Sequence, residues 1–513
     1  MDTHSHAAVV GAGPVGCLTA LSLAARGFTV SIYERRPDPR HHQIGSGSRD
    51  NASAPRSINL AISARGLKAL SSVNVETDRN MADVVLSHAV PMRARMIHTK
   101  DEGQGVKQMS QAYGLNGECI NSVSRTLLND LLLDQASAHP AVSLHFNCKL
   151  RSVDLQAREK DPQAEGECHL NFESWEGSGP ASRYSALVVG CDGINSIVRS
   201  TIARLTPVNF QQEYIDSSYL ELRIPPKIED GAATFALDPN HLHIWPRHSF
   251  MLIALANLDK SFTSTLFAPQ AIIGRLTSRG AILEFFANEF PDALKLMGDE
   301  DVVATLLPRQ GKGSPLSSVK CYPYHYKGRA VFLGDAAHAM LPFYGQGLNC
   351  GFEDVGFLTN LIDKHGVRGD PGQSVGSGKS VQGEKEENAW DRYSPLLAQA
   401  FTEYSKERHP DLIAISYLAT QNYHEMSSRV VSPLYLIRKS LDGLLMKTLP
   451  KGWWISLYSM VTFSPEIGYA EAKKREARQS VIIERVLVAS GLAAMTGLGL
   501  AGRWLLKNRR DLW

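Results

Sequence analysis

Short apolar runs alternate with a helical pattern at the start of the chain, and similar runs return at two later points. Residues 7–10 and 29–33 are apolar runs typical of buried strands, and residues 17–26 between them have the spacing of a helix. Two further runs occupy residues 188–190 and 331–333. Buried strands that alternate with helices indicate an α/β protein with a doubly wound parallel sheet.

The pattern changes in the second half of the chain. Between residues 207 and 325, short segments alternate at period two and follow one another at roughly hairpin spacing, which predicts an antiparallel sheet inserted into the α/β protein. Residues 366–388 are rich in Gly, Ser, Lys and Glu, with almost no apolar side chains, which predicts a disordered surface loop. Beyond this loop the spacing becomes helical. We therefore expect a discontinuous α/β domain (1–206 and 326–365), a sheet domain (207–325), the loop 366–388 and a helical region (389–480).

Composition limits the classes of protein to which this chain can belong. Of 513 residues, 43% are hydrophobic, which is enough to bury a sizeable core and excludes a wholly disordered or collagen-like chain. The 54 Lys and Arg against 52 Asp and Glu give a net charge of +2, and this balance gives no support to nucleic-acid binding. Seven scattered cysteines without a Cys-x-x-Cys spacing indicate a reducing compartment and no zinc site, so we expect no bound metal.

A glycine-rich motif follows the first apolar run. Gly11-Ala12-Gly13-Pro14-Val15-Gly16 leads into the first helix, and the second strand ends at Glu34. The first Gly permits a tight turn, the second lets the backbone approach a pyrophosphate, and the third lets helix and strand pack closely. The helix N-terminus attracts phosphates, and Glu34 can accept hydrogen bonds from ribose hydroxyls. The motif predicts dinucleotide binding, with FAD and NAD both open because Arg35 and Arg36 could offset the charge of Glu34.

Two acidic residues at strand ends favour FAD. Asp192 follows the run 188–190, and Asp335 follows the run 331–333. Doubly wound sheets bind ligands at the carboxyl ends of their strands, where both acids are expected to lie. The second acid precedes a Gly-rich loop and a helix over 349–362, whose N-terminus can stabilise negative charge on a reduced isoalloxazine.

In this order, the three segments resemble the single-component FAD-dependent aromatic hydroxylases, which have the para-hydroxybenzoate hydroxylase fold. Four further stretches, 56–66, 91–98, 242–247 and 458–464, are similar to the branch of that family that hydroxylates kynurenine. The resemblance extends over about residues 7–480. It implies a Rossmann-type FAD-binding domain with an inserted antiparallel-sheet substrate domain.

The resemblance also implies a reaction. L-Kynurenine would be hydroxylated to 3-hydroxy-L-kynurenine through a flavin C4a-hydroperoxide, a step of tryptophan degradation and pyridine nucleotide synthesis. FAD would be bound, while NADPH and O2 would be co-substrates. The resemblance implies that NADPH docks transiently, which fits the lack of a second Gly-x-Gly-x-x-Gly unit between a predicted strand and a helix. The aniline nitrogen of kynurenine already activates its ring, so no residue is assigned as a general acid or base.

Several positions match the substrate and flavin contacts of the family. Arg95 corresponds to the arginine that pairs with the substrate carboxylate, which suits a guanidinium because it can hold a carboxylate with two hydrogen bonds. The resemblance implies further substrate contacts at Tyr113, Asn422 and Tyr458, and an aromatic wall at Phe343. Besides Gly11, Gly13, Gly16 and Asp192, the flavin contacts that it implies are Val15, Tyr33, Glu34, Arg35, Arg36, Ala61, Arg125, Leu150, Ile197, Asp335, Leu348 and Asn349.

Other functions remain open at this point. A phenol or salicylate hydroxylase of the same family is one alternative, although the stretch around Arg95 argues against it. A flavin oxidase or dehydrogenase is another, and an inactive membrane-bound flavoprotein scaffold is the alternative that is not an enzyme. Tyr344 stands where the family pattern has Phe or His, which leaves the shape of the pocket beside Phe343 open.

An apolar run close to the C-terminus predicts a membrane anchor. Residues 486–502 carry no charge, residues 504–506 extend the run past Arg503, and basic residues follow within 507–510. As a helix, residues 486–506 have the length needed for a hydrocarbon core of roughly 30 Å. With the resemblance, this run predicts a tail anchor in the mitochondrial outer membrane and a catalytic part facing the cytosol. The alternative is that this helix docks on the protein's own core. Small residues recur at every fourth position of the run, which is compatible with pairing of two such helices and leaves the oligomeric state open.

Overall fold

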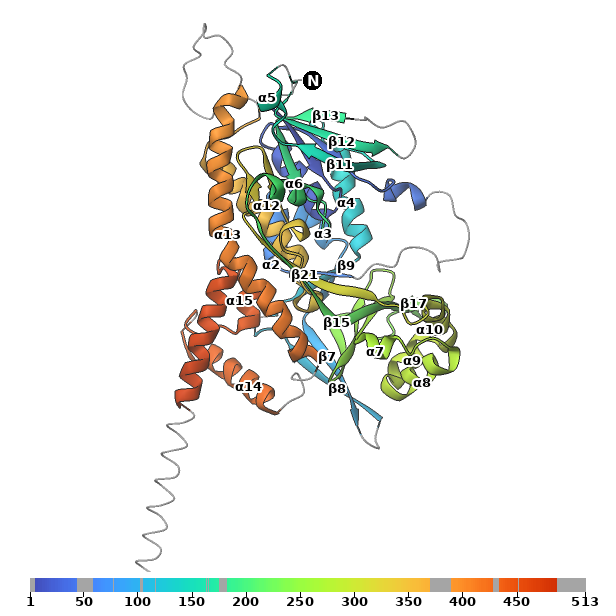
Figure 1. Ribbon diagram of the computed structural model, residues 1–513. Helices are drawn as coiled ribbons and strands as arrows, with labels where there is room; N and C mark the ends of the chain where they lie inside the picture. Colours follow the sequence, from blue (N-terminus) through green and yellow to red (C-terminus); the bar gives the residue numbers. More distant parts are fainter. Residues whose placement is uncertain are drawn as a thin grey trace, which may run out of the picture.

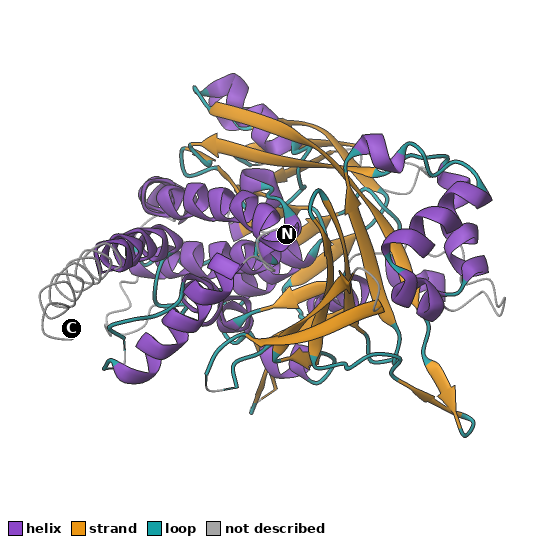
Figure 2. Ribbon diagram, turned by 90° about the horizontal axis from the view of Figure 1, so that it is seen from below, coloured by secondary structure: helices purple, strands orange, loops and turns teal. Residues whose placement is uncertain are grey.

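The computed structural model places an α/β body beside a second sheet and a group of C-terminal helices (Figure 1). Figure 2 shows that helices flank the strands of the molecule on two opposite sides. The structure describes residues 5–43, 59–76, 78–101, 105–115, 117–162, 164, 166–174, 182–369, 389–427, 433–450 and 452–486.

Five parallel strands form the centre of the α/β body. The six-stranded sheet has the order β10-β2-β1-β14-β23-β22, and each pair is parallel except β22 with β23. Near-continuous apolar runs are typical of strands that are covered on both faces, and β1, β14 and β23 are fully buried. The parallel sheet predicted from the sequence is confirmed. Its strands are β1 (His6–Val10), β2 (Thr29–Tyr33), β10 (Val142–His145), β14 (Leu187–Gly190), β22 (His325–Tyr326) and β23 (Ala330–Phe332).

Four helices form the layers around this sheet. Helix α1 (Pro14–Ala24) begins with a proline, which suits the first position of a helix, and contacts β1, β2 and α4 (Arg125–Ala138). Helix α12 (Gly347–Lys364) packs against α1, and α6 (Ile197–Leu205) packs against β14. The helices predicted over 17–26 and 349–362 are therefore confirmed as elements.

Smaller elements connect the strands and helices of the α/β body. The antiparallel sheets β3-β9-β6 and β11-β12-β13 and the hairpin β4-β5 belong to this group. Their strands are β3 (Leu60–Ile62), β4 (Asn74–Glu76), β5 (Arg79–Asn80), β6 (Val90–Met92), β9 (Ile120–Val123), β11 (Cys148–Asp154), β12 (Cys168–Ser174) and β13 (Ser182–Ser185). The short helices are η2 (Pro39–Gln43), α2 (Ala64–Leu70), α3 (Met81–Leu86), α5 (Ala157–Lys160), α11 (Asp335–His338) and η4 (Pro342–Tyr344).

The second sheet has seven strands and draws on more of the chain than the sequence predicted. Its order is β21-β15-β20-β19-β18-β7-β8, and β7 (Ala94–Asp101) and β8 (Gly105–Ala112) precede the expected segment 207–325. The pair β7 and β18 is parallel, so the expectation of a wholly antiparallel sheet is wrong at this position. A pairing between such distant segments leaves no signal in local periodicity. The other strands are β15 (Asn209–Ile224), β18 (His241–Arg247), β19 (Phe250–Ala256), β20 (Phe262–Ala268) and β21 (Ser314–Tyr322).

Helices cover one face of the seven-stranded sheet, while the first half of β15 is largely exposed. A core around Trp245, Phe262 and Phe286 lies between the sheet and the helical segment 270–309. In Figure 1 this segment covers the side of the sheet opposite the C-terminal helices. It comprises α7 (Gln270–Ile273), α8 (Arg279–Glu289), α9 (Pro291–Met297), α10 (Asp299–Leu306) and η3 (Leu307–Arg309), and the hairpin β16 (Lys227–Glu229) and β17 (Ala232–Thr234) lies nearby in the sequence.

Helices dominate the described residues between 389 and 486, where the sequence predicted a helical region. They are α13 (Ala389–Ser427), α14 (Pro433–Thr448), α15 (Leu457–Phe463) and a last helical stretch over 469–486. Helix α13 contacts α12 in the α/β body and then β18, β19 and β21 of the seven-stranded sheet. The C-terminal helices therefore connect the two sheets (Figure 1).

Two predictions fall on segments that the structure leaves undescribed. Of the predicted loop 366–388, only residues 366–369 are described, and residues 487–513, which hold nearly all of the predicted anchor 486–506, lie outside the described ranges. Within the described ranges, no helix combines the length and the apolar character needed to cross a membrane.

Candidate active site

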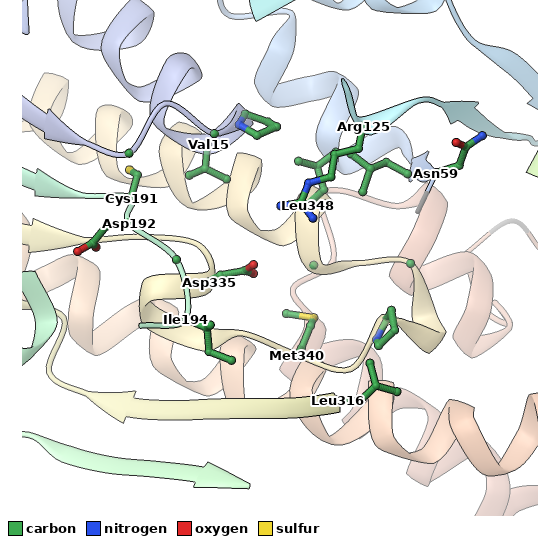
Figure 3. Close-up of a pocket in the computed structure, with 18 of the residues that line it drawn as sticks. Val15, Asn59, Arg125, Cys191, Asp192, Ile194, Leu316, Asp335, Met340 and Leu348 are labelled. Carbon is green, nitrogen blue, oxygen red and sulfur yellow. The ribbon is translucent and has the colours of Figure 1, made fainter. Parts of the chain in front are cut away.

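A cavity of about 840 Å³ lies where the α/β body, the seven-stranded sheet and the C-terminal helices meet. Its walls include the glycine-rich turn after β1, the ends of β14 and β23, the start of α12 and side chains of six strands of the seven-stranded sheet. Figure 3 shows Val15, Leu348 and Arg125 above this cavity and Asp335, Ile194, Met340 and Leu316 below it. Ligands of doubly wound proteins bind at this edge of the sheet.

The three glycines of the turn differ in what a side chain at each position would contact. A Cβ on Gly11, which has φ +103°, would collide with the carbonyl oxygen of Cys191, and a Cβ on Gly16 would collide with the carbonyl oxygen of Gly11. Gly13 is different, because among the described residues no atom other than those of its chain neighbours lies within 4 Å of where its Cβ would be. Gly13 is the N-cap residue of α1, and no side chain caps this helix. The backbone N–H groups of the first helical turn can therefore donate hydrogen bonds to a phosphate bound in the cavity.

Glu34 directly follows β2 and lies beside the glycine-rich turn. Its Oε2 accepts a hydrogen bond of 3.0 Å from the backbone N–H of Ala12, and its Oε1 accepts bonds from the N–H and the Nε of Arg36. Burial by itself raises the pKa of Glu34, but the hydrogen bonds and charge of Arg36 and the N–H of Ala12 hold it below its ordinary value. The carboxylate therefore stays charged, with lone pairs left for ribose hydroxyls.

The two strand-end acids occupy different environments. Asp192 accepts hydrogen bonds of 2.7 and 3.3 Å from the N–H groups of Ile197 and Val198 at the start of α6, and burial raises its pKa. Asp335 opens the short helix α11 after Gly334, whose φ of +59° favours glycine. Asp335 is exposed to the cavity.

Asn349 acts as a structural bridge behind the cavity wall. Its Nδ2 donates to the carbonyl oxygens of Ala61 and Gly345 at 2.8 Å each, and its Oδ1 accepts from the N–H of Ser63 at 2.8 Å. These bonds join β3 to the first turn of α12. Asn349 therefore fixes the cavity wall through Ala61, and it does not itself line the cavity.

Most of the residues predicted to contact the flavin come together here. Gly16 and Asn349 lie behind the wall, and the other fourteen predicted positions line the cavity: Gly11, Gly13, Val15, Tyr33, Glu34, Arg35, Arg36, Ala61, Arg125, Leu150, Asp192, Ile197, Asp335 and Leu348.

Arg95 lies at the other end of the same cavity. This residue of β7 is buried, its Nη1 is 3.4 Å from Oε1 of Glu425 on α13, and its guanidinium lies 4.7 Å from the ring centre of Tyr458 and 5.8 Å from that of Tyr113. The two tyrosine rings stack on each other at 5.1 Å. Burial raises the pKa of both tyrosines, so their hydroxyls stay protonated.

Phe343 and Asn422 form the adjoining wall. Phe343 lines the cavity, and its ring lies 5.0 Å from that of Phe267 on β20. Asn422 on α13 donates from Nδ2 to the carbonyl oxygen of Phe343 at 2.6 Å, so it acts on the cavity through the backbone of η4. Tyr344 also lines the cavity, and its ring stacks 5.9 Å from Tyr458. Tyr344 thus extends the aromatic platform beside Arg95.

Three polar residues near Arg95 were missed in the sequence analysis: Glu425, Gln111 and Lys439. Gln111 is directly opposite Arg95 in the β7–β8 register and accepts a hydrogen bond of 3.1 Å from Nζ of Lys439 on α14. Burial, together with the charge of Arg95, lowers the pKa of Lys439 to about 8 against the opposing effect of Glu425. The period of two along a strand places Gln111 on the face of Tyr113 and could have identified it, whereas nothing local points to Lys439.

Comparisons with known proteins agree with this geometry. An FAD binding domain family matches residues 4–366. Proteins named kynurenine 3-monooxygenase from Debaryomyces hansenii and Candida albicans are each 44% identical to this chain over 98% of its length, covering 96% and 98% of their own. A third of the same name, from Mycosarcoma maydis, is 40% identical over 99% of this chain and 94% of its own length.

The chain belongs to the kynurenine 3-monooxygenase family. Solved structures of more distant proteins support the fold. The p-nitrophenol 4-monooxygenase of Pseudomonas putida has a TM-score of 0.57 at 16% identity, over 94% of this chain and 98% of its own. A 2-methyl-3-hydroxypyridine-5-carboxylic acid oxygenase has a TM-score of 0.55 at 17% identity, over 85% and 95%. This kynurenine 3-monooxygenase family member therefore has the α/β fold of FAD-dependent monooxygenases, as predicted.

FAD is the cofactor of this kynurenine 3-monooxygenase family member, which confirms the prediction. The residues present fit it, because the open space at Gly13 admits a pyrophosphate and Glu34 offers acceptors for an adenosine ribose. Asp335 and Leu348, in the first turn of α12, line the same cavity.

Proposed function

We propose that this chain hydroxylates L-kynurenine to 3-hydroxy-L-kynurenine with NADPH and O2. One observation carries the proposal. A buried arginine, Arg95, stands at the end of a cavity whose other end is a dinucleotide turn, and apolar and aromatic side chains line the space between them. Kynurenine has the complementary form, with an aromatic ring at one end and an amino-acid group at the other.

The amino-acid end of the substrate is assigned to the polar group around Arg95. The guanidinium of Arg95 would hold the substrate carboxylate, supported by the nearby charge of Lys439. Glu425, 3.4 Å from Arg95, offers a carboxylate to the α-ammonium group. Tyr113 and Tyr458 present a stacked platform beneath the guanidinium, which fixes the position of Arg95.

The aromatic end of the substrate is assigned to the apolar walls. Phe343 and Phe267 meet edge to face on one side, and Leu242, Met251, Ile253 and Leu316 line the remainder. These side chains orient the ring and exclude water from the reacting carbon. FAD, when bound, supplies the redox and oxygen chemistry of the reaction. The ring is activated by its own amine, so no acid or base is assigned among the residues of the chain.

NADPH is proposed as the transient source of the hydride. The sequence has one Gly-x-Gly-x-x-Gly unit between a strand and a helix, Gly11 to Gly16, which we assign to FAD; the other match to this spacing, Gly497 to Gly502, lies in the apolar C-terminal run. A second nucleotide would therefore bind without a fingerprint of its own.

We also propose that residues 486–506 anchor the protein in the mitochondrial outer membrane, with the catalytic part in the cytosol. The run has no charge from 486 to 502 and is followed by basic residues. Deletion of residues 487–513 should release the protein from isolated mitochondria. A truncated protein that still sediments with the membrane would contradict the anchor.

The proposed reaction is tested by measuring NADPH oxidation with and without L-kynurenine and by identifying the product. We expect kynurenine to accelerate NADPH oxidation and 3-hydroxykynurenine to form in near-equal amount. Hydrogen peroxide alone would indicate an oxidase. Turnover of phenol or salicylate in place of kynurenine would indicate a different hydroxylase, and a yellow protein without kynurenine-stimulated oxidation would indicate a scaffold.

A further inference from the structure

Two buried arginines from distant parts of the chain meet at one glutamate of α12. Arg65 on α2 and Arg408 on α13 are 1% and 2% exposed. Nη1 of Arg65 donates to Oε1 of Glu353, and Nη2 of Arg408 donates to Oε2 of the same residue, each at 2.7 Å. We name Arg65, Glu353, Arg408 and Asp354 the α12 ion cluster. None of its members lines the cavity.

Arg65 binds the C-terminal end of α15. Its Nε donates to the carbonyl oxygen of Val461 at 2.6 Å, and its Nη2 donates to those of Met460 at 3.1 Å, Ser464 at 3.2 Å and Ile467. The last turn of a helix has carbonyl groups without partners inside the helix, and one guanidinium supplies several of them here. Arg65 thus fixes the helix that carries Tyr458.

Arg408 makes the corresponding connection to α13. Its Nε donates to Oδ1 of Asp354 at 2.9 Å, and its Nη2 donates to the carbonyl oxygen of Cys350 at 3.3 Å. Farther along, the same long helix carries Asn422 and Glu425 of the substrate end. The two arginines therefore attach both substrate-binding helices to α12.

Asp354 links the cluster to the turn that presents Asp335 to the cavity. Its Oδ2 accepts a hydrogen bond of 3.2 Å from the N–H of Gly334, which precedes Asp335, and it also pairs with His338. Burial raises the pKa of Asp354, but the charges of His338 and Arg408 outweigh this effect and lower it. The turn that presents Asp335 is therefore held by the helix to which α13 and α15 are attached.

A metal site is the competing interpretation of part of this cluster. Ligand atoms of His338, Cys350 and Asp354 lie within 4.8 Å of one another. Both oxygens of Asp354 already accept hydrogen bonds, one of them from a guanidinium, and burial raises the pKa of the Cys350 thiol well above its ordinary value. These groups satisfy one another as an ion pair network, which leaves no ligand set for a cation.

Buried ion pairs contribute little net stability, because desolvation of the charges offsets their attraction. The cluster instead fixes the relative positions of the helices, because a guanidinium is rigid and planar and has five N–H donors. We propose that Arg65 and Arg408, acting through Glu353, are positioning residues that fix Tyr458 and Glu425 relative to the flavin site. They hold the ring of the substrate where hydroxylation outcompetes release of peroxide. This inference rests on the proposed function and extends it.

Arg65→Lys tests the proposal most directly. Lysine keeps a positive charge that can pair with Glu353, but it lacks the guanidinium N–H groups that bind the carbonyl oxygens of α15. Arg26→Lys is the matched control, because Arg26 pairs with Asp363 near the other end of α12 at 2.6 Å, away from the cavity. The measured quantities are bound FAD, the KM for kynurenine and the amount of 3-hydroxykynurenine formed per NADPH oxidised.

We expect Arg65→Lys to retain FAD while its KM rises about tenfold and its yield of product per NADPH falls at least about threefold, since displacement of about 1 Å can have such effects. Arg26→Lys should leave both values unchanged. An Arg65→Lys protein with lowered Tm but wild-type KM and product yield would overturn the proposal, because the cluster would then be merely structural.

Two further measurements keep the inference separate from the proposed reaction. Hydrogen exchange of residues 457–463, measured without substrate, should be faster in Arg65→Lys than in Arg26→Lys, and equal rates would overturn the proposal even if no kynurenine is turned over. If Arg65→Lys does not yield FAD-loaded protein, Arg408→Lys is expected to fold and to show the same loss of product yield. Failure of both variants to fold with FAD would also overturn a positioning role.

Discussion

The guanidinium of Arg95 on β7 lies 4.7 Å from the ring centre of Tyr458 on α15, so the seven-stranded sheet and the C-terminal helices together form the end of the cavity to which we assign the substrate. The remainder of the site lies in the α/β body, which holds FAD. In the proposed function, substrate and cofactor are bound by different parts of the chain, and substitutions in one part should leave the other function intact.

Arg95→Ala should raise the KM for kynurenine by at least about 30-fold, because removing one partner of a buried charge pair costs on the order of 2–5 kcal/mol. Bound FAD, measured from the flavin absorbance of the purified protein, should not change. Arg93→Ala is the control, since Arg93 is exposed on the same segment of chain. An unchanged KM in Arg95→Ala would show that the carboxylate binds elsewhere.

Gly13→Ala and Gly16→Ala should separate cofactor binding from folding. Among the described residues, no atom other than those of its chain neighbours would contact a Cβ on Gly13, so that variant should keep its Tm without FAD while its Kd for FAD rises about tenfold or more, because the methyl group enters the pyrophosphate space. A Cβ on Gly16 would collide with the carbonyl oxygen of Gly11, and the cost should be about 1–3 kcal/mol of stability. Thermal unfolding and FAD titration of both apoproteins test this, and a Gly13→Ala protein with wild-type FAD affinity would contradict it.

Glu34→Gln should weaken FAD binding by roughly 10- to 100-fold, because it replaces charge-assisted hydrogen bonds worth about 1.5–3 kcal/mol. Glu159→Gln is the same chemical change at an exposed pair with Lys327 and should have no effect on FAD. The Kd is read from flavin fluorescence during titration of apoprotein. Equal affinities in the two variants would remove Glu34 from the cofactor site.

The charge of Lys439 should appear in the pH dependence of the reaction. Burial lowers the pKa of Lys439 to about 8, so the amine is protonated below that pH and loses its charge as the pH rises through it. A cation near Arg95 favours the substrate carboxylate, and kcat/KM for kynurenine should therefore fall above pH 8.

Lys439→Arg keeps the charge at every pH of such an experiment and should move the fall in kcat/KM to higher pH. Titration of the substrate itself is common to both proteins, so the difference between the two profiles isolates Lys439. The profiles are measured between about pH 6 and 10 with saturating NADPH. Superimposable profiles would contradict the role of this lysine.

Local patterns of the sequence predicted the sheet and the glycine-rich turn of the α/β body. The turn from Gly11 to Gly16, the acid at Glu34 and the strand-end Asp192 and Asp335 are each contiguous with a strand, and the carboxyl ends of parallel strands necessarily lie along one edge of a sheet. The parallel sheet, the helices α1 and α12, and the FAD cofactor followed from these patterns together with the family resemblance.

The substrate half depends on contacts between segments that are far apart in the chain. The parallel pairing of β7 with β18 and the approach of Lys439 to Gln111 leave no local signal, because long-range packing decides which surfaces meet. The same holds for the place of Asn422, which contacts the backbone of Phe343, and for the α12 ion cluster. The sequence by itself determined which dinucleotide turn the protein has and where it stands in the sheet. Only the tertiary structure decided which polar groups surround Arg95, because those groups come from a strand and from two helices that meet only in the folded chain.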